Sequence, residues 1–194
     1  MSRKSEIIEE ALLLYAEKGY EGMTLKEIAK RVGVTAPAVY AFFKNKEDLF
    51  VHMCKGFLGT HFQIAFDHTQ QLTKQTAEEK LESIVREIFV FQISKPMEIK
   101  VFLRLVLFPP DVVENDVMDE FHNLENKEME IFEHIFRDAI SNREIRNGDP
   151  KVYAESFILF MDGLFWQMQR MEEDAFWERF DRQWRNFWHN LKDQ

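Results

Sequence analysis

The chain has 194 residues, of which 45% are hydrophobic, and only seven glycines and five prolines, which is typical of a mostly helical globular fold. Its single cysteine, Cys54, excludes an internal disulfide framework and a cysteine-based zinc finger. Acidic residues interrupt the first apolar run, and no apolar stretch approaches the ~18 residues of a membrane span. We therefore expect an all-α cytoplasmic protein with neither a signal peptide nor a membrane partner.

A net charge of −9 argues at first against a nucleic-acid partner, but the charges are unevenly distributed. Residues 1–46 hold eight Lys and Arg against six Glu, whereas the other 148 residues hold 17 basic against 28 acidic residues. If residues 1–46 form a mildly basic reading head on an acidic body, the charge difference would orient the head toward DNA. The alternative is that the acidic body only keeps the protein soluble.

In chain order, the first helix is expected from about Arg3 to Lys18, with Gly19 ending it. The stretch from Met23 to Phe50 then predicts a helix-turn-helix. Thr24 can cap its first helix, and Glu27 three positions later completes a capping box.

Gly33 stands where the chain must reverse, because glycine enters the left-handed conformation at little cost. Thr35 is expected to cap the second helix, and Pro37 suits the second helical position, where its missing N–H costs nothing.

The second helix of this pair has the composition of a recognition helix. Val39, Phe42 and Phe43 are expected to face inward, which leaves small residues, Tyr40 and Lys44 on the outward face. A surface of that kind can approach base edges closely in a major groove. The alternative is an ordinary helical hairpin in another kind of bundle.

These residues also carry a resemblance to a known family. Gly33-Val34-Thr35, Val39-Tyr40 and the run from Phe42 to Phe50 resemble the DNA-binding end of the tetracycline repressor (TetR) family of bacterial regulators. The segment from Ile7 to Thr24 is similar to that family's first helix and loop. The resemblance covers roughly residues 3–50.

The rest of the chain keeps helical spacing and shows no convincing strand pattern. Further helices are expected at about 46–71, 76–94, 96–107, 111–142 with a break near Asn115, 149 onward, and 173–192. The helix after residue 149 is apolar almost all round and so should be covered on two sides. We predict a DNA-binding domain at 1–48 and a ligand-binding and dimerisation domain at 49–194. The resemblance implies nine or ten helices, the last two forming a dimer interface.

Residue type and position, together with the resemblance, predict the DNA contacts. Hydroxyl and ammonium groups near helix ends should meet phosphates, while others face bases. The predicted DNA-binding residues are Thr24, Lys26, Thr35, Ala36, Pro37, Ala38, Tyr40, Ala41, Lys44 and Lys46.

The chain departs from the family at several of these positions. Ala36 and Pro37 stand where many relatives have Lys and Gly, and Ala41 and Phe42 stand where hydrogen-bonding side chains are frequent. Direct hydrogen bonding to bases should therefore be sparse. Lys26, methyl contacts to thymine and DNA shape are left to carry much of the specificity.

The body has an excess of Phe and Met, which suits a pocket for a bulky, mainly apolar small-molecule effector. Each such residue could instead be plain core, and the acidic surplus would suit a cationic ligand. Those predicted nearest a cavity are Phe62, Phe66, Phe89, Phe102, Phe108, Met118, Phe121, His122, Phe157, Met161, Phe165 and Trp166.

The aromatic ridges of the last two helices could pack within one chain or across a twofold axis, and we favour a homodimer because two reading heads are needed for operator specificity. The predicted interface residues are Tyr153, Phe157, Phe160, Leu164, Trp177, Phe180, Trp184, Phe187 and Trp188.

No catalytic motif or cofactor-binding loop is found, so no enzyme activity, cofactor or metal is predicted. Asp119, His122 and Glu125 share one helical face, but a solvated face is the simpler interpretation. The sequence thus predicts a homodimeric repressor that binds a palindromic double-stranded DNA operator and is released by a small apolar ligand. The alternative is a helical carrier or enzyme without operator binding.

Overall fold

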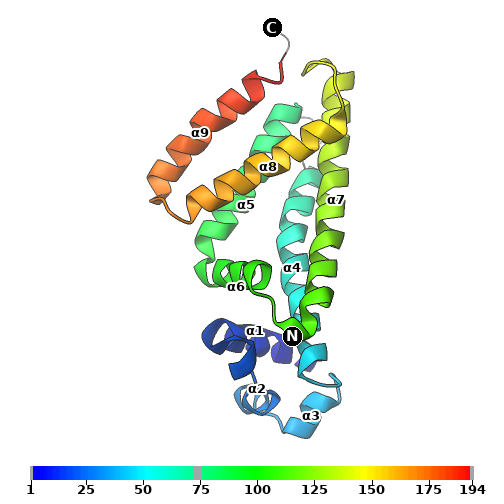
Figure 1. The fold of residues 1–194 in the computed structure, drawn as a ribbon, viewed down its shortest axis with the longest axis vertical. Coiled ribbons are helices and arrows are strands. Elements are labelled where there is room, and N and C mark those ends of the chain that lie inside the picture. Colours follow the sequence, from blue (N-terminus) through cyan, green and yellow to red (C-terminus); the bar gives the residue numbers. More distant parts are fainter. Residues whose placement is uncertain (1, 72–75, 193–194) are drawn as a thin grey trace. The chain divides into compact units, whose positions relative to one another are not determined.

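The computed structural model describes the backbone of residues 2–71 and 76–192, with all of their side chains except those at 61 and 64–71. Within these residues the structure has no strand, which confirms the all-α prediction (Figure 1). Its elements are α1 (Arg3–Gly22), α2 (Leu25–Val32), α3 (Ala36–Tyr40), α4 (Lys46–Gln71), α5 (Ala77–Ser94), α6 (Pro96–Leu107), the 3₁₀ helix η1 (Asp111–Val113), α7 (Glu114–Ser141), α8 (Pro150–Met168) and α9 (Glu173–His189).

The chain packs as two compact units. Unit 1 comprises residues 1–61 and 95–124, and unit 2 comprises residues 62–94 and 125–194. Unit 1 therefore holds α6 and the start of α7 in addition to the reading head, whereas the predicted division between residues 48 and 49 follows only the sequence order. The helices α4 and α7 each contribute to both units.

The end of α1 is kinked rather than terminated. Ser2 caps the helix by accepting the Ser5 N–H at 3.1 Å, but Gly19 leaves helical geometry at φ 71° and ψ −176° before one more turn follows. This backbone region is open essentially only to glycine. Gly19 thus kinks the helix at the position where its end was predicted, but the predicted end is wrong because helical structure resumes and reaches Gly22.

The turn between α2 and α3 has the predicted chemistry. The Thr24 hydroxyl accepts the Glu27 N–H at 3.2 Å, but the Glu27 carboxylate lies 3.7 Å from Arg31 and does not accept the Thr24 N–H, so only half of the predicted capping box forms. Gly33 is left-handed at φ 74° and ψ 32°. The Val34 N–H then reaches back to the Ala29 carbonyl at 2.9 Å, which closes the end of α2.

Unit 1 buries one continuous apolar core. Ile7, Leu14, Ile28, Val39 and Phe50 are fully buried in it, and α6 lies across α1 within the same unit (Figure 1). Three short helices alone would make a thin core, and α6 with the first part of α4 supplies the surface that covers them.

Unit 2 is built around an aromatic core. Thr76 and Glu79 form a capping box at the start of α5, with the Thr76 N–H donating to the Glu79 carboxylate at 2.9 Å. Phe157 of α8 packs edge-on to Phe132 of α7 at 4.8 Å and contacts Trp184 of α9 at 6.3 Å between ring centroids. These pairs join α7, α8 and α9 within the unit.

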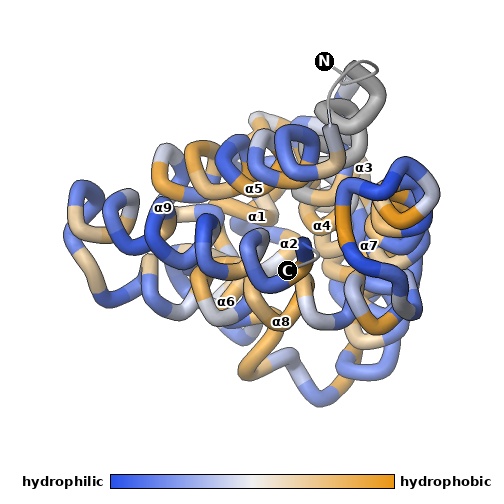
Figure 2. The backbone as a smooth tube through the Cα atoms, turned by 90° about the horizontal axis from the view of Figure 1, so that it is seen from above, coloured by the Kyte–Doolittle hydropathy of each residue, from blue (hydrophilic) through white to orange (hydrophobic). Residues whose placement is uncertain are grey.

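The two last helices differ in their outward faces. The tube of α8 is more hydrophobic along its length than that of α9 (Figure 2). On α8, Val152, Leu159 and Trp166 are 52%, 70% and 44% exposed, at intervals of seven residues. Within the single chain α8 is therefore covered on one side only, and the expectation of cover on a second side stays a prediction.

Candidate nucleic-acid interface

The start of α4 is held by a network of short-range contacts. The Asn45 side chain accepts the Asp48 N–H at 2.8 Å, and the Asp48 carboxylate accepts the Lys44 N–H at 2.8 Å. The Lys46 ammonium lies over the Tyr20 ring at 4.0 Å from its centroid. A cation fixed at a helix N-terminus is well placed to bind a phosphate.

Tyr20 connects this helix start to the end of α1. Its hydroxyl donates to the Glu47 carboxylate at 3.2 Å, and its ring packs edge-on to Phe50 at 4.9 Å. Burial, with the neighbouring Glu47 charge, raises the pKa of Tyr20 to about 12. Tyr20 therefore stays a protonated donor at physiological pH and keeps Lys46 in place.

The recognition helix α3 is five residues long, and aromatic side chains at its last position and just after it are exposed. Val39 and Phe43 are buried as predicted, whereas Tyr40 is 57% exposed. Phe42 is 42% exposed, so its predicted inward orientation is wrong. The helix ends at Tyr40 and a turn follows, and this turns Phe42 away from the face that helical spacing assigns to it.

Thr35 occupies the N-cap position of α3 but makes no side-chain capping hydrogen bond, which corrects the expected role of its hydroxyl. None of the ten predicted DNA-binding residues is buried. Thr24, Lys26, Thr35, Pro37, Tyr40, Ala41 and Lys44 are exposed, and Ala36, Ala38 and Lys46 are partly buried.

The basic residues of the head differ in their availability. Arg31 is engaged by Glu17 at 2.6 Å, by Glu27 at 3.7 Å and by Glu10 at 3.9 Å, and the bond to Arg31 lowers the pKa of Glu17. Arg31 therefore ties α1 to α2 and is neutralised. Lys26 and Lys44 form no ion pair within the described part of the chain, so both can meet DNA.

Comparison with known proteins identifies this arrangement. Residues 7–53 match the model of the family described as "Bacterial regulatory proteins, tetR family". This segment of the chain carries the DNA-binding domain of the TetR family. The match spans α1 to the first turns of α4, and these include all ten residues predicted to contact DNA.

A curated relative extends the comparison beyond this segment. The chain is 33% identical over 84 residues to the fatty acid metabolism regulator protein of Bacillus subtilis, an alignment covering 43% of this chain and 42% of that protein. The chain thus matches less than half of the length of that curated relative.

Two solved structures show the same fold over nearly the whole chain. One is the transcriptional regulator FadR of Bacillus subtilis in complex with stearoyl-CoA, at 21% identity, a TM-score of 0.69 and 96% coverage of both chains. The other is AibR in complex with isovaleryl coenzyme A and operator DNA, at 22% identity, a TM-score of 0.60 and 89% coverage of both chains.

The predicted pocket residues do not form one group within either unit. Unit 1 holds Phe102, Phe108, Met118, Phe121 and His122. Phe102 packs edge-on to Phe121 at 5.8 Å, while Phe108 is largely exposed.

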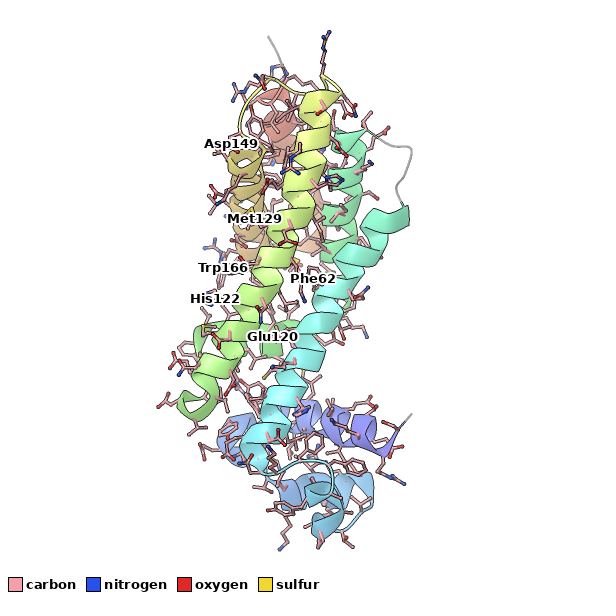
Figure 3. The ribbon with its side chains drawn as sticks, turned by 90° about the vertical axis from the view of Figure 1, so that its right-hand side faces the viewer. Phe62, Glu120, His122, Met129, Asp149 and Trp166 are labelled. Atoms are coloured by element: carbon pink, nitrogen blue, oxygen red, sulfur yellow. The ribbon has the colours of Figure 1, made fainter. Side chains whose placement is uncertain are left out.

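The remaining pocket residues belong to unit 2, and they stay a prediction. Phe89 and Phe157 are fully buried core, while Met161 and Phe165 are partly buried against that core. The Phe66 side chain lies outside the described residues. Figure 3 shows Phe62 on α4 and Trp166 on α8 among the labelled side chains of this unit, which also include Met129 on α7 and Asp149 at the start of α8.

The residues predicted for the dimer interface face mostly inward. Phe180, Trp184 and Trp188 stack along α9, with the last two at 6.2 Å and 13° between ring planes. Of the predicted set, Tyr153, Phe157, Leu164, Phe180, Trp184 and Trp188 are buried within unit 2, whereas Phe160, Trp177 and Phe187 are partly buried. The aromatic ridges therefore cover each other inside one chain, and the six buried residues offer no surface to a second copy.

Sequence reasoning missed a group of carboxyls on α7 and α8. Burial raises the pKa of Glu128 to about 7, and the neighbouring charges of Glu125 and Asp162 add to the shift. Burial and the charge of Glu125 also raise the pKa of Asp162. No sequence signal joins residues that lie more than 30 positions apart, so only the packing of α7 against α8 reveals this group.

Within the described part of the chain, no group of three or more His, Cys, Asp and Glu side chains is arranged to hold a metal ion, and this includes Asp119, His122 and Glu125. Among the same residues, no helix combines the length and the apolar character that a membrane span requires.

Proposed function

We propose that this protein is a cytoplasmic transcriptional repressor that binds a palindromic operator as a homodimer and releases it when a small, mainly apolar ligand binds unit 2. The match of residues 7–53 to the TetR family carries this proposal. The accessible hydroxyl, ammonium and aromatic groups on α2, α3 and the start of α4 support it.

A second copy of the chain is the proposed partner of the exposed face of α8. Val152, Leu159 and Trp166 form an apolar stripe, and an added Cβ at Gly163 would meet no atom within 4 Å. Another helix can therefore approach this face closely. Two such faces across a twofold axis would bury the stripe and bring two reading heads to one operator.

The proposed effector has an apolar body, and acyl thioesters are the first class to test. The solved structure of FadR is a complex with stearoyl-CoA, and that of AibR is a complex with isovaleryl coenzyme A. In this chain, the aromatic side chains of unit 2 would receive the apolar part. The partly buried Glu128 with Glu125 and Asp162 would disfavour an anionic group beside them, which makes free fatty acids poorer ligands at that point.

Release from DNA requires that the ligand binds two conformations unequally. The single helix α4 runs from the proposed phosphate anchor Lys46 into unit 2. A ligand that displaces α4 in unit 2 would change the separation of two recognition helices, which must span about one DNA turn of ~34 Å.

Selection from sheared genomic DNA tests this proposal. The native protein should retain specific fragments at moderate salt, and stearoyl-CoA or a shorter acyl-CoA should release them. The competing function, a carrier or enzyme without operator binding, predicts monomers in sedimentation and no retained fragment. The repressor proposal would be rejected if the protein retained no specific fragment, even at concentrations high enough to saturate nonspecific DNA binding.

A further inference from the structure

Unit 1 contains a cavity of about 590 Å³ that the proposed function does not use. It lies between the kinked end of α1 and the segment that follows α6. Its lining residues are Tyr15, Lys18, Gly19, Tyr20, Glu21, Arg104, Phe108, Pro110, Asp111 and Val112. A second cavity of about 410 Å³ shares Arg104 and Phe108 with it and adds Lys100 and Leu107.

Arg104 presents a cation that has no ion-pair partner in the described part of the chain. Its guanidinium donates to the Tyr15 main-chain carbonyl at 3.0 Å and lies 5.6 Å from the centroid of the Tyr15 ring. Glu21 and Asp111 line the same cavity, but Arg104 forms no ion pair with either of them among the described residues, and its hydrogen-bond partner is a main-chain carbonyl. The carbonyl uses one donor of a group that has five, so the guanidinium is positioned and can still bind an oxyanion.

The cavity also has an exposed apolar wall. Phe108 is 75% exposed and Val112 is 65% exposed, and Pro110 lies between them in the chain. Nothing in the described parts of unit 1 covers the Phe108 ring. An exposed aromatic ring beside a positioned cation is suited to a molecule with both an apolar surface and an anionic group.

We propose that this cavity binds a small organic anion, with a carboxylate on a flat apolar body, and that it is an effector site separate from unit 2. Arg104 binds the carboxylate, and the rings of Phe108 and Tyr20 receive the apolar body. The neutral carbonyl partner of Arg104 stays in place, so the site needs no rearrangement to accept the anion.

The position of the cavity would couple this ligand to DNA binding, a consequence that rests on the proposed function. Tyr20 lines the cavity and also holds Lys46 at 4.0 Å and Glu47 at 3.2 Å. A ligand that presses on Tyr20 thus acts on the proposed phosphate anchor. Gly19, at φ 71°, leaves room for Arg104, whose Nη1 would lie 3.4 Å from an added Cβ.

Chemical-shift titration of the ¹⁵N-labelled full chain tests the site without DNA. The probes are 1-naphthoate, the neutral 1-naphthol and inorganic phosphate. We expect 1-naphthoate to shift the Gly19 and Tyr20 amides and the Arg104 Nε–H signal in a saturable way. The other two probes should bind about tenfold more weakly or not at all, because 1-naphthol lacks the carboxylate and inorganic phosphate lacks the apolar body.

Three variants locate the contacts. Arg104→Gln should weaken naphthoate binding about tenfold or more, and Phe108→Ser should weaken it several-fold, since these changes remove a positioned charged hydrogen bond and an apolar wall. Arg182→Gln, an exposed arginine of α9, is the matched control and should bind as the native protein does. Since Phe108 is largely exposed, its variant keeps the test informative even if Arg104→Gln unfolds.

Equal binding of naphthol and naphthoate, equal binding of phosphate, or unchanged affinity in both cavity variants would overturn the site. In the DNA assay, naphthoate should change the operator affinity of the native protein, and Phe108→Ser should need a several-fold higher naphthoate concentration for the same change. A site that binds naphthoate with no effect on DNA affinity overturns the coupling, whereas absence of DNA binding altogether rejects the proposed function and leaves the site standing.

Discussion

Replacing Lys46 by Ala is expected to weaken binding to all DNA sequences alike. The Lys46 ammonium is fixed over the Tyr20 ring at 4.0 Å, at the start of α4, where a phosphate is the natural partner. Removing one phosphate interaction lowers the slope of log affinity against log salt by about 0.9, so two protomers should together lower it by about 1.8. Removal of the cation–π interaction should also reduce the free energy of unfolding by about 0.5–1 kcal/mol.

Fluorescence anisotropy at several salt concentrations measures both the affinity and its salt dependence, with a retained genomic fragment and a scrambled duplex as ligands. Lys26→Ala is the companion variant, because the exposed Lys26 is expected to face bases and should change sequence preference. Lys151→Ala, exposed at the start of α8, controls for the change in net charge. If Lys46→Ala and Lys26→Ala act identically on specific and scrambled DNA, the division between phosphate and base contacts is refuted.

Three further predictions concern assembly, backbone and charge. Leu159→Glu should convert the proposed dimer to folded monomers in sedimentation, with helical content unchanged by circular dichroism, whereas Val90→Glu, at an exposed apolar position on α5, should leave the proposed dimer intact. Gly19→Ala should destabilise the fold by about 1–3 kcal/mol in urea unfolding because of its φ of 71° and ψ of −176°, while Gly56→Ala inside α4 should be neutral or stabilising. The pKa of Glu128 is raised to about 7, so the folded state binds this proton more tightly than the unfolded state does, and stability should fall as pH rises from about 4.5 to 7. Glu128→Gln should remove that loss. The prediction is contradicted if the melting temperature of the variant has the same pH dependence as that of the native protein.

Local chemistry was predictable from the sequence. The cap at Thr24 and the left-handed Gly33 depend on residues within a few positions of each other, and both form as predicted, although the capping box at Thr24 lacks its second bond. The family resemblance of residues 3–50 was likewise readable, since it rests on a contiguous motif.

Features set by tertiary packing were not predictable. Helical spacing assigned Phe42 to the inner face, but α3 ends at Tyr40 and the following turn exposes the ring. An aromatic ridge such as that of Trp184 and Trp188 has the same sequence pattern whether it packs within one chain or between two chains. Only the burial of its side chains within the single chain distinguishes these arrangements.

Contacts across long sequence separations were equally hidden. Arg104 donates to the Tyr15 carbonyl across 89 positions of the sequence, and no motif at either residue predicts this contact. The cavity beside them depends on how α6 crosses α1 and on the glycine kink at Gly19. A sequence pattern can indicate the elements but not this crossing.

Operator specificity is the central claim, and an equilibrium titration of a retained genomic fragment against a scrambled duplex tests it most directly. At about 0.15 M salt the native protein should bind the retained fragment at least about 10³-fold more tightly, at two protomers per site. Equal affinity for the two duplexes, or saturation at one protomer per site, would contradict the account.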